Sequence, residues 1–369
     1  MTGKKPIVSL VVGARPNFVK AAPILQEIKR QEVALVDLIH TGQHYDYSMS
    51  KSFFDLFSLP EPHRNLGIGS GGHGEQTGKI LIEFEKLVIE ERPDMVLVLG
   101  DVNSTLAAAL VAAKLNLPVA HIEAGLRSFD RRMPEEINRI LTDHVSDFLF
   151  VTEKSGVVNL QNEGIASEKI HLVGNVMIDA LRGIEEKIDA SGILGSLGVK
   201  PFEYSTVTLH RPSNVDNPDA LRRCLSVLKV AARNGAVVFP VHPRTAKSIC
   251  SGGMKAEFDR IKGLLMTSPL RYEDFMCLIK SSSFIMTDSG GIQSEASYLK
   301  TPCITLREST EHQITLSEGT NRLTGFDQDA IKKAIEDALV FDRKSFPLPS
   351  LLDGKASTRI VSVISQYLS

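Results

Sequence analysis

Short apolar runs alternate with longer amphipathic segments along most of the chain, and this alternation constrains the fold more than any other feature. Near the start, "PIVSLVVG" precedes "NFVKAAPILQEIKRQ", and further on "DMVLVLGD" precedes "STLAAALVAAKLN". Strand-like runs that are each followed by a helix-like segment predict βαβ units and therefore a parallel sheet. Runs such as "MVLVL" and "FLFVT" lack polar alternation, which is typical of strands covered on both faces.

A second series of such runs begins near residue 204 with "YSTVTLH", "AVVFPVHP", "FIMTDSGG" and "PCITLRE". Two domains of ordinary size suit a chain of 369 residues better than one core does. The segment between the two series, "DASGILGSLGVKPFEY", is rich in glycine and small residues, as domain boundaries often are. We therefore expect two α/β domains, over residues 1–180 and 181–355, and a C-terminal helix over 356–369 that packs back on the first domain.

The charge balance argues against several classes of partner. The 42 basic and 44 acidic side chains leave a net charge of −2, which does not favour nucleic acid or an anionic membrane surface. Apolar runs fall short of the roughly 20 residues that cross a bilayer, so we expect a cytoplasmic protein. The four cysteines are irregularly spaced and match no metal or redox motif.

Acidic residues follow the predicted strands of the first half. Asp101 ends "VLVLGD", Glu123 ends "PVAHIE", and Glu135 opens the helical segment "PEEINR". Parallel strands place their carboxyl ends at one edge of the sheet, where open α/β folds bind ligands, so we expect these acids to lie together. Neighbouring carboxylates can raise one another's pKa and supply a general acid or base near neutrality. A solvated loop is the alternative for any single acid in this stretch, Glu123 excepted.

The segment "MTDSGGIQSEA" repeats this design in the second half. Asp288 or Ser289 can cap the following helix, while Gly290 and Gly291 let a ligand approach the main chain. Glu295 follows about one turn later and suits a ribose diol. This pairing suggests a nucleoside diphosphate, and the alternative is an ordinary helix cap with a tight turn.

Cationic residues accompany both series. The turn in "VVGARPNFVK" places Arg15 and Lys20 at a helix start, where N–H groups and the helix dipole favour an anion. It lacks the G-x-G-x-x-G fingerprint of dinucleotide binding. His210 and His242 each end a strand beside an arginine. Either histidine alone is more often structural, but next to an anion site an imidazolium and Arg211 can stabilise a departing diphosphate.

Taken in order, these motifs resemble the non-hydrolysing UDP-N-acetylglucosamine 2-epimerases. The resemblance spans nearly the whole chain, through "GARPNFVKAAP", "TGQHYD", "GDVNST", "HIEAGLRS", "MPEEINR", "VGNVMIDAL", "TLHRPSNV", "TDSGGIQSEA" and "EGTNRLTG". It implies a glycosyltransferase-B-like fold of two Rossmann-like, doubly wound domains with an active-site cleft between them. It also implies a homodimeric enzyme of polysaccharide biosynthesis that acts on a UDP-sugar and uses neither a redox cofactor nor a metal.

The reaction that the resemblance implies is the interconversion of UDP-N-acetylglucosamine and UDP-N-acetylmannosamine. A base removes the C2 proton while UDP leaves C1 by anti elimination, and UDP adds back to 2-acetamidoglucal after protonation of the other face. Carried across motif by motif, the catalytic residues are Asp101, Glu123, Glu135 and His210. The substrate-binding residues are Arg15 and Phe275 for uracil, Ser289, Gly290 and Gly291 for the diphosphate, Glu295 for the ribose, and also Lys20, Arg139 and His242.

The sequence also departs from the family. The common "QEEA" reads "QSEA" over 293–296, and "TERPE" reads "TEHQI" over 310–314. At the family's activator site Gln43 is retained, but Asp46 and Glu75 replace a glutamine and an arginine. Activation by a second substrate molecule therefore stays open, as does a modified sugar such as a 2,3-diacetamido uronic acid. Further alternatives are a hydrolysing 2-epimerase, a UDP-sugar glycosyltransferase and a non-catalytic UDP-sugar-binding protein.

Overall fold

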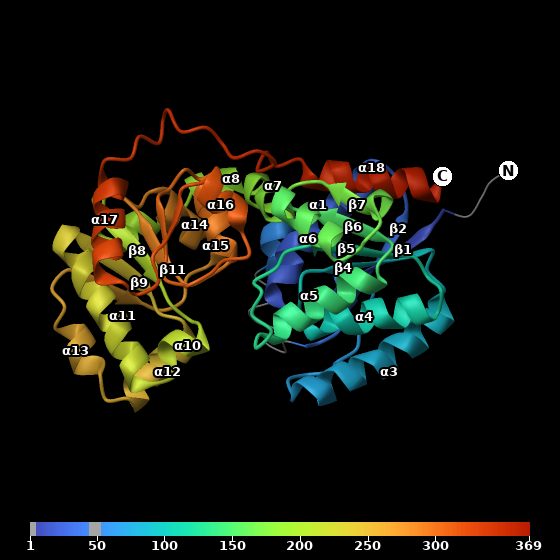
Figure 1. Ribbon diagram of the computed structural model, residues 1–369, viewed down its shortest axis with the longest axis horizontal. Coiled ribbons are helices and arrows are strands. Elements are labelled where there is room, and N and C mark those ends of the chain that lie inside the picture. The colour runs from blue at the N-terminus through green and yellow to red at the C-terminus, as the bar shows by residue number, and fades with distance from the viewer. Residues whose placement is uncertain (1–4, 44–52) are drawn as a thin grey trace. The chain divides into compact units, whose positions relative to one another are not determined.

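The computed structural model describes residues 5–43 and 53–369, and the side chain of Arg15 also lies outside the description. The chain folds as two compact units. Unit 1 comprises Met1–Gly183 and Leu351–Ser369, and unit 2 comprises Ile184–Ser350. Each unit is built around one sheet whose strands all pair in parallel (Figure 1). The two parallel sheets that the sequence predicted are thereby confirmed.

The sheet of unit 1 has seven strands in the order β3-β2-β1-β4-β5-β6-β7. Their bounds are β1 Ile7–Val12, β2 Leu35–His40, β3 Arg64–Asn65, β4 Met95–Leu99, β5 Val119–Ala124, β6 Phe148–Val151 and β7 Ile170–Leu172. The chain starts at β1, moves outward to β3, and returns beside β1 to continue through β4 in the other direction. In such doubly wound sheets, ligands bind outside the carboxyl ends of the strands at this reversal.

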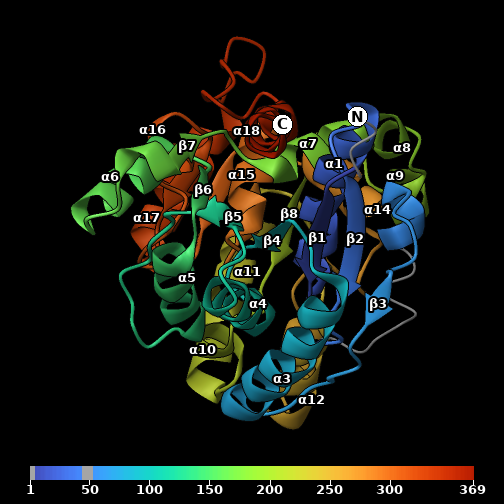
Figure 2. The same cartoon turned by 90° about the vertical axis from the view of Figure 1, so that its right-hand side faces the viewer.

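Helices cover both faces of this sheet. The helical segments of unit 1 are α1 Arg15–Arg30, α3 His73–Glu91, α4 Asn103–Lys114, α5 Pro134–Val145, α6 Lys154–Asn162, η1 Ser167–Lys169, α7 Val176–Gly183 and α18 Ala356–Leu368. Helices α3, α4 and α5 pack side by side on one face, and α1, α7 and α18 pack together on the other (Figure 2). Every residue of β4 is buried between them, as the uninterrupted apolar run predicts.

The start of the C-terminal helix is hydrogen-bonded to a side chain from another helix of unit 1. Asp179 of α7 accepts hydrogen bonds from the backbone N–H groups of Ala356 (3.1 Å) and Ser357 (2.7 Å). These are the first residues of α18, whose own N-cap residue, Lys355, makes no side-chain cap. The first N–H groups of a helix lack partners within it, so Asp179 satisfies two of them.

The sheet of unit 2 has six strands in the order β10-β9-β8-β11-β12-β13. Their bounds are β8 Tyr204–Thr208, β9 Ala236–Pro240, β10 Leu264–Thr267, β11 Ile285–Thr287, β12 Cys303–Thr305 and β13 Asn321–Leu323. The winding direction again reverses beside the first strand, here between β8 and β11. This places the carboxyl ends of β8 and β11 at the position where a doubly wound sheet binds its ligand.

The helical segments of unit 2 are α8 Glu185–Asp189, α9 Ile193–Leu197, α10 Pro212–Val215, α11 Pro218–Ala231, η2 Ala232–Asn234, α12 Pro243–Ser251, α13 Lys255–Asp259, α14 Tyr272–Lys280, α15 Gly291–Tyr298, α16 Gln313–Ser317 and α17 Gln328–Leu339. The glycine-rich boundary segment contains α9, which ends at Gly198 with a φ of 64°. In the described part of the chain, none of the helices has both the length and the apolar character of a membrane span.

Candidate active site

Glu123 occupies an irregular position at the carboxyl end of β5. The register against β6 shifts between Ile122 and Ala124, so Glu123 is the extra residue of a β-bulge, and its φ is 76°. A positive φ is uncommon for a non-glycine residue and costs on the order of 1–3 kcal/mol. Bulges re-aim a side chain, and the side chain of Glu123 forms an ion pair with Lys20 in which both side chains are largely buried.

The bulge changes the face of the sheet that Glu123 serves. Side chains two positions apart on a regular strand lie on the same face. His121, two residues earlier, contacts Asp143 of α5, so a regular β5 would direct Glu123 toward the α5 face. Glu123 instead contacts Lys20 of α1, which packs on the opposite face with α7 and α18. The bulge therefore brings this carboxylate to the α1 side of the strand ends.

Residues that follow β1 and β4 lie next to the Lys20–Glu123 ion pair. Asn17 accepts hydrogen bonds from the N–H groups of Gly13 (3.2 Å) and Ala14 (3.0 Å) and donates one to the carbonyl of Leu99 (3.0 Å). Gly100 follows Leu99 with a φ of 67°, and a Cβ there would lie 3.2 Å from Lys20 Nζ and 3.3 Å from Glu123 Oε2. A glycine is required here because a side chain would meet both partners and favour a different backbone conformation.

The Asp101 carboxylate forms an ion pair with Arg139. Arg139 of α5 approaches Asp101 Oδ2 with Nη2 at 2.8 Å and contacts Glu136 Oε2 with Nη1 at 2.6 Å. The Asp101 side chain keeps 31% of its surface exposed, whereas Arg139 and Glu136 are buried. Asn138 also donates to the backbone carbonyl of Asp101 at 2.9 Å. One face of α5 thus fixes Asp101 while leaving its carboxylate open to a ligand.

Glu136 and Glu135 are adjacent in sequence but differ in environment. Glu136 is buried and accepts hydrogen bonds from the N–H groups of Ser128 and Phe129, each at 2.9 Å. Burial raises the pKa of Glu136, but these N–H groups and Arg139 outweigh burial and lower it below its ordinary value. Glu135 lies exposed in the first turn of α5. The motif drew attention to Glu135, and the bracing role of Glu136 was missed because adjacent acids look alike in a sequence.

Four residues on the amino-terminal side that the sequence analysis singled out differ in their surroundings. Arg15 begins α1, but its side chain lies outside the described residues, as does Asp46. The carboxamide oxygen of Gln43 accepts from the N–H (3.1 Å) and hydroxyl (2.6 Å) of Ser104, so it braces the start of α4. Glu75 is exposed on α3 and pairs with Lys79 at 2.6 Å.

In unit 2, a fully buried carboxylate organises the turn after β8. Asp288 accepts hydrogen bonds from the backbone N–H of Arg211 (3.0 Å), the side chain of Asn214 (3.0 Å) and the N–H of His210 (3.1 Å). His210 Nδ1 also lies 3.0 Å from Asp288 Oδ1. Burial raises the pKa of Asp288, but His210 and its other donors outweigh burial and lower it below its ordinary value.

These contacts correct one expectation. Asp288 and Ser289 do not cap α15, because Gly290 is its N-cap residue and no side chain caps it. The N–H of Gln293 donates to the Gly290 carbonyl at 3.1 Å, so the N–H groups of Gly291 and Ile292 are the ones left to a ligand or solvent. A Cβ at Gly290 would lie 2.6 Å from Glu311 Oε1, so any larger residue there would displace the Glu311 carboxylate. Gly291 is exposed and a Cβ there meets nothing.

The two predicted histidines lie beside this turn. The rings of His210 and His242 have centroids 5.5 Å apart. His242 is the N-cap of α12, where its Nδ1 accepts from the N–H of Arg244 at 3.2 Å. The Nδ1 contact with Asp288 fixes the ring of His210 and leaves its Nε2 edge for a partner. The structure thus brings His210, His242 and the Ser289 turn together at the carboxyl ends of β8, β9 and β11.

Glu295 and Phe275 lie deeper in unit 2. Glu295 is 3% exposed, and the hydroxyl of Tyr272 donates to its Oε1 at 2.5 Å. Burial and the Glu295 carboxylate together raise the pKa of Tyr272 well above its ordinary value, so this hydroxyl remains a donor. Phe275 is partly buried and packs against the apolar cluster of Tyr204, Val238 and Leu278.

Sequence reasoning assigned no role to a buried ion pair next to the glycine turn. Arg307 Nη2 lies 2.7 Å from Glu311 Oε2, and both side chains are almost fully buried. Glu311 Oε1 lies 4.0 Å from Arg211 Nη2. Arg307 follows the carboxyl end of β12 by two residues, so the strand-end rule that selected Asp101 would have found it.

Two other features of the described residues lie away from these strand ends. His63 Nε2 lies 3.3 Å from Glu91 Oε1, and its Nδ1 lies 4.0 Å from Asp37 Oδ1. Arg64 also contacts Glu91, at 3.1 Å, so this His–carboxylate cluster also includes a cation.

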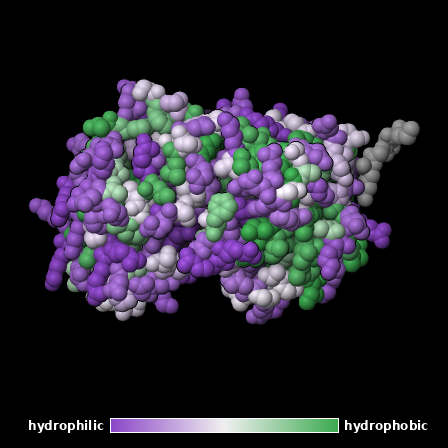
Figure 3. Space-filling model, in the orientation of Figure 1, coloured by the Kyte–Doolittle hydropathy of each residue, from purple (hydrophilic) through white to green (hydrophobic). Residues whose placement is uncertain are grey.

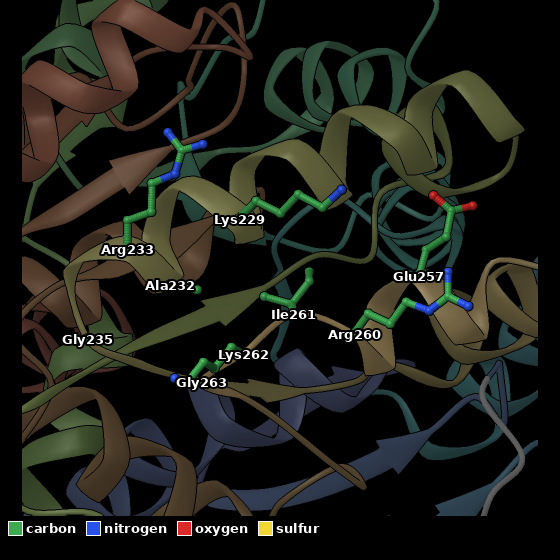
Figure 4. Close-up of a pocket in the computed structure, with 9 residues that line it drawn as sticks. All are labelled: Lys229, Ala232, Arg233, Gly235, Glu257, Arg260, Ile261, Lys262 and Gly263. Atoms are coloured by element: carbon green, nitrogen blue, oxygen red, sulfur yellow. The ribbon is translucent and has the colours of Figure 1, made fainter.

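A cavity of about 720 Å³ in unit 2 is lined by nine residues that include Lys229, Arg233, Arg260 and Lys262 (Figure 4). It lies at the amino ends of β9 and β10, opposite the His210 edge, because Gly235 and Gly263 immediately precede these strands.

Comparison with known proteins gives consistent matches over the full chain. A family model described as UDP-N-acetylglucosamine 2-epimerase matches residues 26–365. The UDP-N-acetylglucosamine 2-epimerase of Methanocaldococcus jannaschii is 42% identical over 363 residues, covering 97% of this chain and 98% of the relative. The UDP-2,3-diacetamido-2,3-dideoxy-D-glucuronate 2-epimerase of Pseudomonas aeruginosa is 41% identical over 362 residues, covering 96% and 98%.

The crystal structure of the M. jannaschii UDP-GlcNAc 2-epimerase in complex with UDP-GlcNAc and UDP matches with a TM-score of 0.89 and 41% identity, covering 98% of this chain and 99% of that one. Two doubly wound units, with carboxylates at the strand ends of one and a glycine turn in the other, define a two-domain α/β enzyme of the glycosyltransferase-B-like fold. The chain belongs to the UDP-N-acetylglucosamine 2-epimerase family and is an isomerase. The resemblance read from the sequence is confirmed at this level.

Proposed function

We propose that the protein interconverts UDP-N-acetylglucosamine and UDP-N-acetylmannosamine by elimination and re-addition of UDP. The observation that carries this proposal is the geometry of Glu123, whose bulge and positive φ aim a carboxylate at Lys20, next to the Gly100 turn that leads into Asp101. Strained backbone of this kind persists where the surrounding structure enforces it, and it clusters at active sites. The M. jannaschii relative, which carries this activity in its name, supports the same substrate.

In the proposed mechanism, the unit 1 carboxylates handle the proton at C2. One of Asp101, Glu123 and Glu135 accepts the C2 proton as the C1–O bond to UDP breaks, which gives 2-acetamidoglucal and the UDP anion. A protonated carboxyl then returns a proton to C2 from the opposite face, and UDP re-forms its bond to C1. Lys20 and Arg139 keep Glu123 and Asp101 in position through the ion pairs described above. No redox change occurs, because the sugar loses a proton and UDP and then gains a proton, from the second carboxyl group, and UDP.

Unit 2 has the groups that suit the departing UDP. The exposed Gly290–Gly291 turn, with Ser289, offers N–H groups to the diphosphate, as helix starts do for anions. His210, oriented by Asp288, donates to the leaving oxygen and stabilises the charge that develops there. Glu295 binds the ribose hydroxyls, while Phe275 and Arg15 contact the uracil. His242 lies next to His210 and contributes to diphosphate binding.

A second substrate is favoured by one specific observation. The P. aeruginosa relative is named for a 2,3-diacetamido uronic acid sugar, and its 41% identity nearly equals that of the M. jannaschii enzyme. Ser294 stands in place of the first glutamate of the family's QEEA motif, which removes a negative charge next to Glu295. A uronic acid sugar carries an extra carboxylate, so loss of a negative side chain suits it. The chemistry at C2 is the same for both sugars.

Product analysis of the purified full chain tests the proposal. Incubation with UDP-N-acetylglucosamine alone is expected to give an equilibrium mixture with its manno epimer, resolved by proton NMR of the anomeric signals. Release of free N-acetylmannosamine and UDP would identify a hydrolysing 2-epimerase. Turnover only after addition of a sugar acceptor would identify a glycosyltransferase, and an unchanged ligand that still binds would identify a binding protein. A parallel incubation with the diacetamido uronic acid nucleotide decides between the two substrates.

We also propose a homodimer in the cytoplasm. Ile82 and Ile89 on α3 and Leu141 on α5 expose 56%, 55% and 46% of their surfaces. Figure 3 shows hydrophobic side chains gathered on unit 1 over α4 and α5. A second copy that packs on this face would remove these side chains from water.

A further inference from the structure

A buried histidine lies behind the candidate catalytic carboxylates without contacting the solvent. His121 of β5 is 0% exposed. Its Nδ1 lies 2.6 Å from Asp143 Oδ1, and its Nε2 lies 2.8 Å from the backbone carbonyl oxygen of Gly100. Both nitrogens of the ring are therefore at hydrogen-bond distance from an oxygen.

Neither of these oxygens is placed to donate. The Gly100 carbonyl can only accept. Asp143 already accepts from the N–H of Gly125 at 3.1 Å and contacts Arg127 Nη1 at 2.7 Å. Both of these groups meet Asp143 Oδ2, and an N–H donor together with a guanidinium on one oxygen favours the ionised carboxylate. Two acceptors on opposite sides of one imidazole require a donor at each nitrogen.

The charges of the side chains around His121 agree with a proton on each of its two nitrogens. Arg127 lies between Asp143 and Glu163, which it contacts with Nε at 2.8 Å and Nη2 at 2.7 Å. With His121 protonated, the cluster holds two positive and two negative groups and is neutral. With His121 neutral, Arg127 alone would balance the fully buried Asp143 and also Glu163, whose side chain is 26% exposed and lies 3.8 Å from His144 Nδ1. Buried charges without partners are strongly unfavourable.

We propose that His121 is held as an imidazolium and acts as a positioning residue for the candidate catalytic carboxylates. Through the Gly100 carbonyl it fixes the turn that leads directly into Asp101. Asp143 binds β5 on both sides of the Glu123 bulge, because it contacts His121 two residues before Glu123 and Gly125 two residues after it. His121 and Asp143 together hold the strained bulge and the end of β4 in one arrangement.

The protonation state is essential to this role. A neutral imidazole has one donor, so it would keep either the Asp143 contact or the Gly100 contact as a hydrogen bond and lose the other. Release of the Gly100 carbonyl would free the turn before Asp101, and release of Asp143 would loosen one flank of the bulge. A displacement of about 1 Å in a catalytic group can cost roughly 10²-fold in rate. The positioning role rests on the proposed functions of Asp101 and Glu123, whereas the charge state of His121 does not.

The charge state is tested by NMR on the full chain labelled with 15N in histidine. Long-range 1H–15N spectra distinguish an imidazolium, which has a proton on each nitrogen, from either neutral tautomer. The His121 signal is assigned by its loss in His121→Gln or, if that variant does not fold, in His121→Asn. We expect an imidazolium at neutral pH. His171 on β7, two strands away from β5, is the internal control, because burial lowers its pKa and its ring should be neutral in the same spectrum. A neutral tautomer for His121 would overturn the inference.

The positioning role is tested by kinetics of His121→Gln and His171→Gln. His121→Gln retains one donor and is expected to lower kcat by about 10²-fold while KM changes by less than about twofold, since the nucleotide-binding groups are untouched. His171→Gln should leave both constants unchanged. Normal kcat in a folded His121→Gln would contradict the positioning role. If the wild-type chain proves inactive on both sugars, the proposed function fails, and the NMR result still decides the charge state of His121.

Discussion

At the scale of single residues, Glu123 carries the clearest mark of function. Its φ of 76° is unfavourable for any side chain, and its position in a bulge removes it from the regular pairing of β5 with β6. The buried ion pair with Lys20 and the close packing of Gly100 against both side chains keep it there. Several independent contacts maintain this unfavourable backbone conformation. This indicates that the direction of the Glu123 carboxylate is functionally important, because it is kept at a cost in local stability.

Substitution of Glu123 by glutamine keeps the shape of the side chain and removes its ability to take a proton. We expect kcat for epimerisation to fall by about 10²–10⁴-fold, the usual contribution of a general acid or base. UDP affinity, measured by isothermal titration calorimetry, should stay within about twofold because binding free energy comes from other groups. Glu85→Gln, an exposed change on α3, is the matched control. Near-normal turnover in Glu123→Gln would remove Glu123 from the chemistry.

Glu295→Ala is expected to change UDP affinity, which Glu123→Gln should leave nearly unchanged. Loss of a carboxylate that binds the ribose diol is expected to weaken UDP by about 1.5–3 kcal/mol, the range for hydrogen bonds to charged groups, and to raise KM accordingly. The same calorimetric titration measures the loss. Tyr272→Phe, which removes only the hydroxyl that donates to Glu295, controls for general disturbance of the pocket. Unchanged UDP affinity in Glu295→Ala would place the ribose elsewhere.

Gly100 offers a test of the packing around the ion pair. Alanine there would adopt a φ of 67° and bring a Cβ within 3.2 Å of Lys20 Nζ. The left-handed conformation alone costs about 1–2 kcal/mol, so Gly100→Ala should lower the free energy of unfolding by at least that amount and also lower kcat. Gly78→Ala, in the interior of α3 with open space around its Cβ, should stabilise by about 0.5–1 kcal/mol. Urea denaturation measures both, and equal effects would contradict the packing described.

At the scale of elements, both sheets place their functional groups by the same rule. The carboxyl ends of β4 and β5 present Asp101 and Glu123, while those of β8 and β11 present His210 and Ser289. In each unit a buried aspartate on a neighbouring element binds backbone N–H groups of these segments, Asp143 in unit 1 and Asp288 in unit 2. Rigid strands thus carry the candidate catalytic groups, and buried carboxylates fix the turns that follow.

The turn after β8 should depend on pH through Asp288. The pKa of Asp288 is lowered in the folded protein, so its stabilising effect is complete above the unfolded value of about 3.9 and is lost as pH falls through the folded value. Asp288→Asn should therefore reduce the free energy of unfolding by about 1.5–3 kcal/mol at neutral pH, with a smaller reduction in acid. Asp219→Asn, an exposed change on α11, should leave the free energy of unfolding unchanged at neutral pH and in acid. A reduction that is independent of pH would contradict the lowered pKa.

The strand ends explain how far the sequence could predict the site. Asp101 and Glu123 in unit 1, and His210 and Ser289 in unit 2, follow or end apolar runs, and parallel pairing brings such positions to one edge within each sheet without knowledge of side-chain packing. The bulge at Glu123 could not be predicted, because its positive φ is enforced by Lys20 and Gly100 from other segments. Asp288 was expected to cap a helix, but the His210 turn, 78 residues away, supplies its donors. Local sequence cannot choose between partners that only the fold brings near.

At the scale of the whole molecule, the exposed apolar face of unit 1 predicts the state of association. Each chain has a mass of 40.4 kDa, so we expect about twice this mass in sedimentation equilibrium. A double change, Ile82→Glu with Ile89→Glu, should shift the mass to that of one chain, because burial of the charges is unfavourable. Val158→Glu changes a similarly exposed side chain on α6 and should leave the dimer intact. A wild-type monomer would contradict the proposal.

The proposed mechanism assigns exchange of the C2 proton to the carboxylates of unit 1 and the uptake of UDP to unit 2. Each group alone is common in α/β proteins, so neither identifies an epimerase without the other. The central claim is therefore that one bound UDP-sugar loses and regains its C2 proton through these carboxylates.

The isotope content of C2 after turnover in deuterated water tests this claim most directly. We predict that UDP-N-acetylmannosamine formed from protiated UDP-N-acetylglucosamine carries deuterium at C2 from the earliest time points, as mass spectrometry and proton NMR would detect. The remaining substrate should gain deuterium as the reverse reaction proceeds. Formation of the manno epimer with protium retained at C2 would contradict exchange through the carboxylates and with it the proposed mechanism.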